Sequence, residues 1–274
     1  MIIKSCMVFV AALAILLASP WVRGQLSGPA PSEHTWVRGA AYRLQTSVFR
    51  SEQIGADPVL VVVLHGDAPF SRPAYQHTFA AKVAATHRDV VAVGLLRPGY
   101  TDLQGNTSDG ERGLTTGDNW NATNTDAIAE AIGALKRRYQ ARKVVVAGHS
   151  GGAAIAANIL GRHPELIDAA LLVSSPCDVE QWRQHMFHRT GHSMFQGTLD
   201  TLSPIEQIKG MSDQVHVTML VGSQDTVAPP GLSERCQAVA AQLGKNVRLV
   251  VLEGKGHEIF LDPAVFAELA PLLQ

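Results

Sequence analysis

The sequence predicts an α/β domain in which a mostly parallel sheet carries helices on both faces. Short apolar runs alternate with longer helical patterns along most of the chain. Several of these runs are rich in Val, as strands buried on both faces are. Of the 274 residues, 46% are hydrophobic and 17% are charged, so the chain can bury a large core. A disordered chain would carry more charge and fewer apolar residues.

Charge and cysteine content exclude two further classes of protein. The 23 Lys and Arg residues nearly balance the 24 Asp and Glu residues, which gives a formal net charge of −1. Nucleic-acid binding usually needs a basic excess, so no nucleic-acid partner is expected. The three cysteines are too few for a disulfide scaffold, and a domain of this size needs no such support.

Residues 1–24 are predicted to be a secretory signal peptide. Lys4 precedes an apolar run from Met7 to Leu17, and small or tolerated residues follow before a cleavage point after residue 24. Ser19-Pro20 ends the run well short of the roughly 20 apolar residues that span a membrane. We expect residues 25–274 to be secreted or periplasmic, without stable membrane association. A retained N-terminal membrane anchor is the alternative.

Export would leave two cysteines in the mature chain, Cys177 and Cys236. In an oxidising compartment they could form a disulfide. Two buried free thiols fit the sequence equally well, because the distance between the two residues cannot be read from it.

The strands and helices are expected in the following order within one domain, residues 25–274. Thr35–Arg50 is predicted to form an antiparallel pair of strands. Further strands are predicted at Val59–Leu64, Val90–Leu95, Lys143–Ala147, Ala169–Ser174, His216–Val221 and Arg248–Leu252. Helices are predicted at Ala74–Thr86, Asn124–Tyr139, Gly151–Arg162, Pro230–Leu243 and Pro263–Leu273. Ligands bind beyond the carboxyl ends of parallel strands, so functional residues are expected directly after the apolar runs.

Residues 176–214 interrupt the alternation after the sixth strand. They are polar and aromatic, and they contain several His residues. We interpret them as a short cap over the carboxyl edge of the sheet.

Gly148-His149-Ser150-Gly151-Gly152 joins a predicted strand to a predicted helix. This is the G-x-S-x-G pattern of a nucleophile elbow, in the strand–turn–helix context that it requires. The sharp turn forces the serine into a strained conformation, and the flanking glycines let the strand and helix pack closely. Ser150 is therefore the candidate nucleophile.

A serine nucleophile needs a base, and the base needs a carboxylate that orients it. In this kind of sheet the partners follow in the order serine, acid, histidine. Asp225 follows the strand that ends at Val221, and His257, the only His beyond Asp225, follows the last strand. We expect Ser150, Asp225 and His257 to form a catalytic triad. Asp178, after the strand Ala169–Ser174, is the rival acid.

The tetrahedral intermediate of acyl transfer also needs hydrogen-bond donors for its oxyanion. The backbone N–H of Gly151 is one candidate. The second is expected from the loop after Val59–Leu64, which reads His65-Gly66-Asp67-Ala68. Gly66 would let the backbone turn there, so the N–H of Asp67 is the predicted donor and that of Ala68 the fallback. The carboxylate of Asp67 would repel an oxyanion, so its side chain should point elsewhere.

The cap contains the weaker signals. His185, His188 and His192 have helical spacing, but no carboxylate joins them downstream, so we predict no metal site and no cofactor. Five large apolar residues either form an acyl or aryl pocket or pack as the core of the cap. These residues are Trp182, Met186, Phe187, Met194 and Phe195. Outside the cap, Asp118–Asn121 is expected to cap the helix that follows rather than to line the site.

Taken together, these motifs resemble the α/β-hydrolase family over essentially all of residues 25–274. The matching motifs are His65-Gly66, Gly148–Gly152, Asp225 and Gly256-His257, and Arg97-Pro98-Gly99-Tyr100 resembles a common segment of the family. The later half is similar to the prolyl-oligopeptidase branch in Ser203-Pro204-Ile205, Gly222–Val227 and Gly254–His257.

The resemblance implies a serine hydrolase that needs no cofactor. Peptidases of that branch carry a large extra N-terminal domain, whereas a short lead-in precedes the first strands here. The resemblance therefore implies an esterase for small to medium esters more readily than a small serine peptidase or amidase. A hydrolase-fold binding protein without activity is a third hypothesis, which an intact triad disfavours. The sequence identifies neither the ester nor the oligomeric state.

Overall fold

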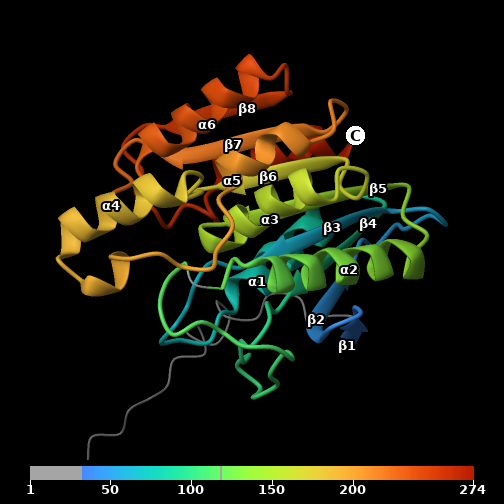
Figure 1. Ribbon diagram of the computed structural model, residues 1–274. Coiled ribbons are helices and arrows are strands. Elements are labelled where there is room, and N and C mark those ends of the chain that lie inside the picture. The colour runs from blue at the N-terminus through green and yellow to red at the C-terminus, as the bar shows by residue number, and fades with distance from the viewer. Residues whose placement is uncertain (1–32, 118) are drawn as a thin grey trace, which may run out of the picture.

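Eight strands form one sheet in the computed structural model, which describes residues 33–117 and 119–274 (Figure 1). The strand order is β1-β2-β4-β3-β5-β6-β7-β8. The predicted signal peptide lies outside the described residues and stays a prediction. Within the described part, no helix is both long and apolar enough to cross a membrane.

The pairing directions confirm the predicted mostly parallel sheet. β1 pairs with β2 and β2 with β4 in antiparallel register, and the other neighbours are parallel. The strands are β1 (Glu33–Arg38), β2 (Arg43–Arg50), β3 (Val59–Leu64), β4 (Val90–Leu95), β5 (Lys143–His149), β6 (Ala169–Val173), β7 (His216–Gly222) and β8 (Val247–Leu252). Each predicted strand is present, and its bounds differ from the prediction by at most two residues.

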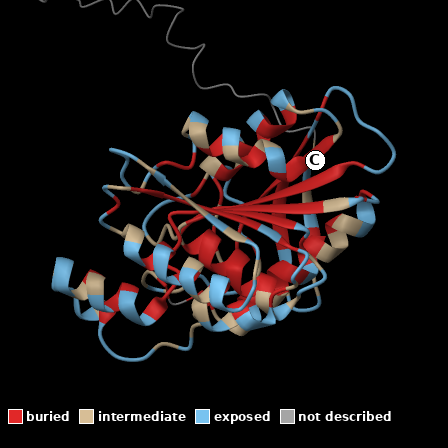
Figure 2. Cartoon of the chain, turned by 90° about the horizontal axis from the view of Figure 1, so that it is seen from above, coloured by how far each residue is buried: buried red, intermediate tan, exposed pale blue. Residues whose placement is uncertain are grey.

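Helices cover both faces because alternate residues of the central strands point to opposite sides. Leu60, Val62 and Leu64 of β3 belong to a core with α2 (Ala122–Arg138), α3 (Gly151–Arg162) and α6 (Pro230–Gln242). The residues between them in β3 belong to a second core with α1 (Tyr75–Thr86) and α7 (Pro263–Leu269), which the 3₁₀ helix η4 (Ala270–Leu273) continues. Figure 2 shows the buried strands between these two helical layers.

The cap lies between β6 and β7, as expected. It contains α4 (Val179–Thr190), η2 (Ser193–Phe195), α5 (Pro204–Gln207) and η3 (Ile208–Gly210). A disulfide joins Cys177, at its start, to Cys236 of α6, which settles the alternative that the sequence left open. Trp182, Met186 and Phe195 are buried in the core shared with α2, α3 and α6, and Phe187 and Met194 pack against it. The apolar residues of the cap thus mainly extend the core of the domain.

The start of α3 lies directly against the ends of β3 and β5, and this contact requires glycine. A Cβ atom on Gly152 would collide with the carbonyl oxygen of Leu64 and lie 2.5 Å from that of His65. A Cβ on Gly148 would lie 2.5 Å from the carbonyl oxygen of Gly152. These neighbours are backbone atoms, which cannot move aside as the end of a flexible side chain can.

We expect Gly152→Ala to lower the free energy of unfolding by about 1–3 kcal/mol, because it overpacks this crossing. Gly133→Ala in α2 is the matched control. A Cβ there would meet its nearest neighbour, the side chain of Arg137, at an ordinary 3.5 Å. A helix-interior alanine should raise stability by about 0.5–1 kcal/mol. Urea denaturation of both variants measures the difference, and equal midpoints would contradict the steric argument.

Candidate active site

Ser150 lies at the turn between β5 and α3 with backbone angles φ 52° and ψ −120°. Residues other than glycine rarely adopt a positive φ, and such strain persists only where the surroundings enforce it. Here the Ser150 N–H donates to the carbonyl of Val173 at 2.9 Å, and its carbonyl accepts from the N–H groups of Ala153 and Ala154. The strained turn is therefore fixed by a neighbouring strand and by the first turn of α3.

The structure brings Ser150, His257 and Asp225 together in one hydrogen-bonded row. His257 Nε2 lies 3.1 Å from Ser150 Oγ, and His257 Nδ1 lies 2.8 Å from Asp225 Oδ2. Asp225 Oδ1 also accepts from the N–H groups of Val227 and Ala228. Burial raises the pKa of Asp225, but His257 and these two N–H groups together lower the pKa below its ordinary value. Asp225 is consequently ionised at neutral pH.

A glycine lets the loop with His257 lie against the end of β7. A Cβ atom on Gly222 would collide with the carbonyl oxygens of Lys255 and Gly256. The N–H of Gln224 donates to the carbonyl of Lys255 at 2.8 Å. These contacts hold the loop that contains His257 against the loop that contains Asp225.

The rival acid, Asp178, has other partners. Its Oδ1 accepts from the N–H of Gln181 at 3.2 Å and caps α4. Its Oδ2 lies 2.8 Å from Arg235 Nε. The carboxylate that contacts His257 is that of Asp225.

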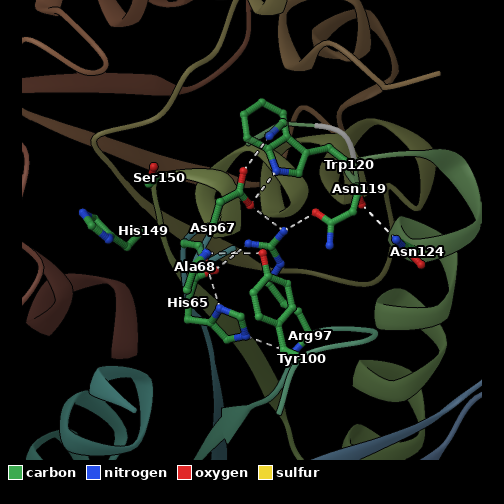
Figure 3. A network of polar contacts seen from close by, with 12 residues as sticks. His65, Asp67, Ala68, Arg97, Tyr100, Asn119, Trp120, Asn124, His149 and Ser150 are labelled. Carbon is green, nitrogen blue, oxygen red and sulfur yellow. Dashed lines mark hydrogen bonds and ion pairs between the residues drawn. The ribbon is translucent and has the colours of Figure 1, made fainter. Parts of the chain in front are cut away.

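A buried ion pair fixes the loop from His65 to Ala68, and Figure 3 shows the surrounding contacts. Asp67 Oδ1 accepts from Arg97 Nη2 at 2.8 Å and from Trp120 Nε1 at 3.1 Å. Asp67 Oδ2 accepts from the N–H of Gly117 at 2.8 Å. The two charged side chains are 3% and 0% exposed, so both charges depend on these partners. The side chain of Asp67 is thus committed to Arg97.

Arg97 also contacts groups other than Asp67. It donates to the carbonyl of His65 at 3.0 Å and to Asn119 Oδ1 at 2.5 Å. Its backbone N–H donates to His65 Nε2, so Nδ1 of that ring carries the proton and donates to the Gly66 carbonyl. Burial, and then the charge of Arg97, place the pKa of His65 well below its ordinary value, which keeps the ring neutral.

The sequence indicates part of this network but not its role. Arg97 belongs to the segment Arg97-Pro98-Gly99-Tyr100, and no local pattern pairs it with Asp67. Asn121 caps α2 as predicted, since its side chain accepts from the N–H of Asn124 at 2.9 Å. Trp120, in the same segment, is fully buried against Asp67 and does contribute to the site. No sequence signal indicated that Gly117 contacts the Asp67 carboxylate.

The histidines of the cap do not gather around one point. His185 Nε2 donates to the carbonyl of Thr226 at 2.9 Å, which ties α4 to the loop after Asp225. Among residues 33–117 and 119–274, no group of three or more His, Cys, Asp or Glu residues is placed to hold a metal ion.

A cavity of about 860 Å³ lies between α4, the segment 195–206 and α6. Phe187 and Phe195 line it together with charged residues such as Arg183 and Arg235. Ser150 and His257 do not line this cavity. Two of its charged side chains have partners: the exposed Arg235 pairs with Asp178, and the buried Arg183 donates to the carbonyls of Met194 and Gln196.

Comparison with known proteins identifies the family. Residues 100–270 match the profile of the prolyl oligopeptidase family, and the chain belongs to this family. No curated protein sequence matches the chain. The sheet and the solved structures similar to it confirm the α/β-hydrolase fold. Together, the family and these structures support a serine hydrolase.

The similar solved structures share the fold at low sequence identity. The Pyrococcus horikoshii acylaminoacyl peptidase superposes with a TM-score of 0.65 at 15% identity, over 89% of this chain and 40% of that one. A Mycobacterium tuberculosis puromycin-hydrolysing peptidase gives 0.68 at 18% identity, over 88% and 38%. A Pyrococcus furiosus esterase gives 0.65 at 13% identity, over 88% of both chains. The chain therefore spans about two fifths of the two peptidases and most of the esterase.

We expect Arg97→Met to lower the free energy of unfolding by about 3–5 kcal/mol, because it leaves the Asp67 carboxylate buried without its counter-charge. The double variant Arg97→Met/Asp67→Asn should recover much of that loss. Arg162→Met removes an ion pair with Asp126 whose side chains are 31% and 35% exposed, and it should change the urea midpoint much less. A double variant no more stable than Arg97→Met would show that charge burial is not the cause.

Proposed function

We propose that the protein hydrolyses small to medium carboxylic esters, with Ser150, His257 and Asp225 as its catalytic triad. The observation that carries the proposal is the hydrogen-bonded row from Ser150 Oγ through His257 to Asp225. A carboxylate that accepts a hydrogen bond from the Nδ1–H group leaves the lone pair of Nε2 facing the serine hydroxyl. The imidazole can then remove the Ser150 proton as the oxygen attacks an ester carbonyl.

The reaction proceeds through two tetrahedral intermediates. His257 returns the proton to the departing alcohol, which leaves the acyl group on Ser150. In the second half, His257 removes a proton from water as the water attacks the acyl-enzyme. It then passes this proton to Ser150 Oγ, which leaves as the acid is released. Asp225 holds the imidazole in the required tautomer and stabilises the imidazolium that forms in each half.

The arrangement of backbone donors supports Gly151 and Asp67 as the oxyanion hole. Gly151 is the first residue of α3, so its N–H has no acceptor within the helix. In the facing loop, the N–H groups of Gly66 and Ala68 donate to the hydroxyls of Tyr75 and Tyr100. Within the described residues no acceptor is found for the N–H of Asp67, which leaves this donor available for a substrate oxygen.

A small serine peptidase or amidase is the second candidate function. It uses the same residues, and the family and two of the similar structures are peptidases. Coverage does not separate the two functions, since the esterase and a Mycobacterium smegmatis proline iminopeptidase each match this chain over most of both lengths. We prefer the ester on the chemistry of the leaving group, because an amide needs firmer positioning of its poorer leaving group.

We also propose that the mature protein functions outside the cytoplasm. The disulfide between Cys177 and Cys236 supports this proposal, because such bonds persist in oxidising compartments.

Ser150→Ala should reduce hydrolysis by on the order of 10⁴-fold or more, and Asp225→Asn by about 10⁴-fold, without unfolding the protein. Asp178→Asn is the matched control, because an asparagine there can still cap α4. Rates with a nitrophenyl ester and melting temperatures of the three variants make the test. Substantial turnover by Ser150→Ala would end the proposal, and a crippled Asp178→Asn would move the acid to that residue.

Rates should be highest for short and medium acyl chains, because the cap offers little apolar surface. Trp182 and Met186 of the cap are buried in the core, whereas Phe187 and Phe195 line a cavity together with charged residues. The outer face of α4 is polar and exposes Glu180, Gln184, His188 and Arg189. A lipid interface needs a wide apolar patch instead. A nitrophenyl ester series from acetyl to palmitoyl, with an aminoacyl anilide alongside, measures the preference. A maximum at palmitoyl, or an anilide cleaved as fast as the best ester, would contradict it.

A further inference from the structure

We propose that Tyr75 and His149 are positioning residues that connect the oxyanion loop to the backbone of His257. This inference rests on the proposed function, since it assigns a role at the same site. It gives a task to the residue before the nucleophile in the elbow and to a tyrosine that the sequence did not indicate.

A series of hydrogen bonds connects the loop that contains Gly66 to the loop that contains His257. The N–H of Gly66 lies 2.5 Å from the Tyr75 hydroxyl, which lies 3.0 Å from His149 Nδ1. On the other side of the ring, His149 Nε2 lies 3.1 Å from the carbonyl oxygen of His257. The Ser174 hydroxyl donates to the same oxygen at 3.0 Å. The N–H of Ile259 also donates to it at 2.9 Å, so three donors hold the His257 carbonyl, two of them side chains.

The donor and the acceptor of every hydrogen bond in this series are determined. The Gly66 N–H can only donate, so the Tyr75 oxygen accepts it and the Tyr75 O–H donates onward. The His257 carbonyl can only accept, so His149 carries its proton on Nε2 and accepts at Nδ1. Only the neutral ring fits this pattern. Burial, followed by the charge of His257, lowers the pKa of His149 to about 4, so this form prevails at neutral pH.

Aromatic rings pack around these hydrogen bonds. The His149 ring contacts the His257 ring and the Phe260 ring, at centroid distances of 5.1 Å and 5.4 Å. Tyr75 packs edge-on against the same Phe260 ring. Hydrogen bonds in such a low-dielectric setting are strong and directional.

Both ends of this series of hydrogen bonds lie at groups that the proposed reaction uses. A Cβ atom on Gly66 would lie 3.1 Å from Ser150 Cβ, so the Gly66 end lies beside the nucleophile. At the other end, Ser174 adopts a positive φ of 52° to place its hydroxyl on the His257 carbonyl. Strained residues of this kind concentrate at functional sites. A shift of the oxyanion loop or of the imidazole by about 1 Å can cost 10²-fold in rate.

The test compares Tyr75→Phe, His149→Phe and His149→Gln with the wild type. A serine-directed fluorophosphonate reports the reactivity of Ser150 whichever acyl substrate the enzyme prefers, and ester kinetics give kcat and KM separately. Tyr139→Phe is the matched control, because its hydroxyl has no hydrogen-bond partner among the described residues. This control should label as fast as the wild type.

Tyr75→Phe and His149→Phe should each label about 10–100-fold more slowly, with kcat reduced and KM within about twofold. The double variant Tyr75→Phe/His149→Phe should label no more slowly than the slower of the two single variants, because either change alone already interrupts the same series of hydrogen bonds. His149→Gln should label faster than His149→Phe, since its amide can donate to the His257 carbonyl. If His149 only packed against Phe260, His149→Phe would label faster than His149→Gln.

Labelling of both phenylalanine variants within twofold of the wild type would overturn the inference, as would losses that multiply in the double variant. If Tyr75→Phe fails to fold, Ser174→Ala probes the same carbonyl with a smaller truncation. An unchanged labelling rate for folded Ser174→Ala would then count against the inference. A folded wild type that does not react at all would remove the proposed function itself, whereas a reactive wild type with equally reactive variants removes only the positioning role.

Discussion

The close crossing of α3 over the ends of β3 and β5 determines how the rest of this edge of the sheet is built. Because Gly148 and Gly152 carry no side chains, backbone meets backbone there. This contact holds Ser150 in its strained turn and brings the loop after β3 next to it. The candidate nucleophile and the candidate oxyanion donors are consequently parts of one rigid junction. The loops of Asp225 and His257 then reach it from the neighbouring strands β7 and β8.

The same close packing places the negative charge of Asp67 beside Gly151, and Arg97 balances this charge. The Asp67 carboxylate lies so near Gly151 that a side chain on that glycine would collide with it. An uncompensated negative charge beside the proposed oxyanion hole would oppose the charge that develops on the substrate. Arg97 neutralises the carboxylate and also binds the carbonyl of His65, so one cation both balances the charge and fixes the loop. Tyr75 and Tyr100 hold the same loop through its N–H groups.

The cap is attached to this edge at several points. The disulfide from Cys177 to Cys236 and the ion pair from Asp178 to Arg235 tie its start to α6. Trp182 donates to the carbonyl of Val227, just after Asp225, and packs against Trp120. The cap therefore shares its core with the loops that carry the candidate acid and the Asp67 network. The position of the cap is therefore coupled to the position of these loops.

The sequence by itself determined the order along the chain of the strands and of the helices outside the cap, the elbow at Ser150 and the two loops that supply Asp225 and His257. These features follow from local patterns, namely apolar runs, turn glycines and polar residues directly after strands. The tertiary structure alone decided that Arg97 binds Asp67, that Trp120 joins them, and that Tyr75 and His149 link Gly66 to the His257 carbonyl. It also decided that Cys177 and Cys236 pair. These contacts join residues far apart in the chain, and a buried polar side chain finds its partner only where packing brings the two together.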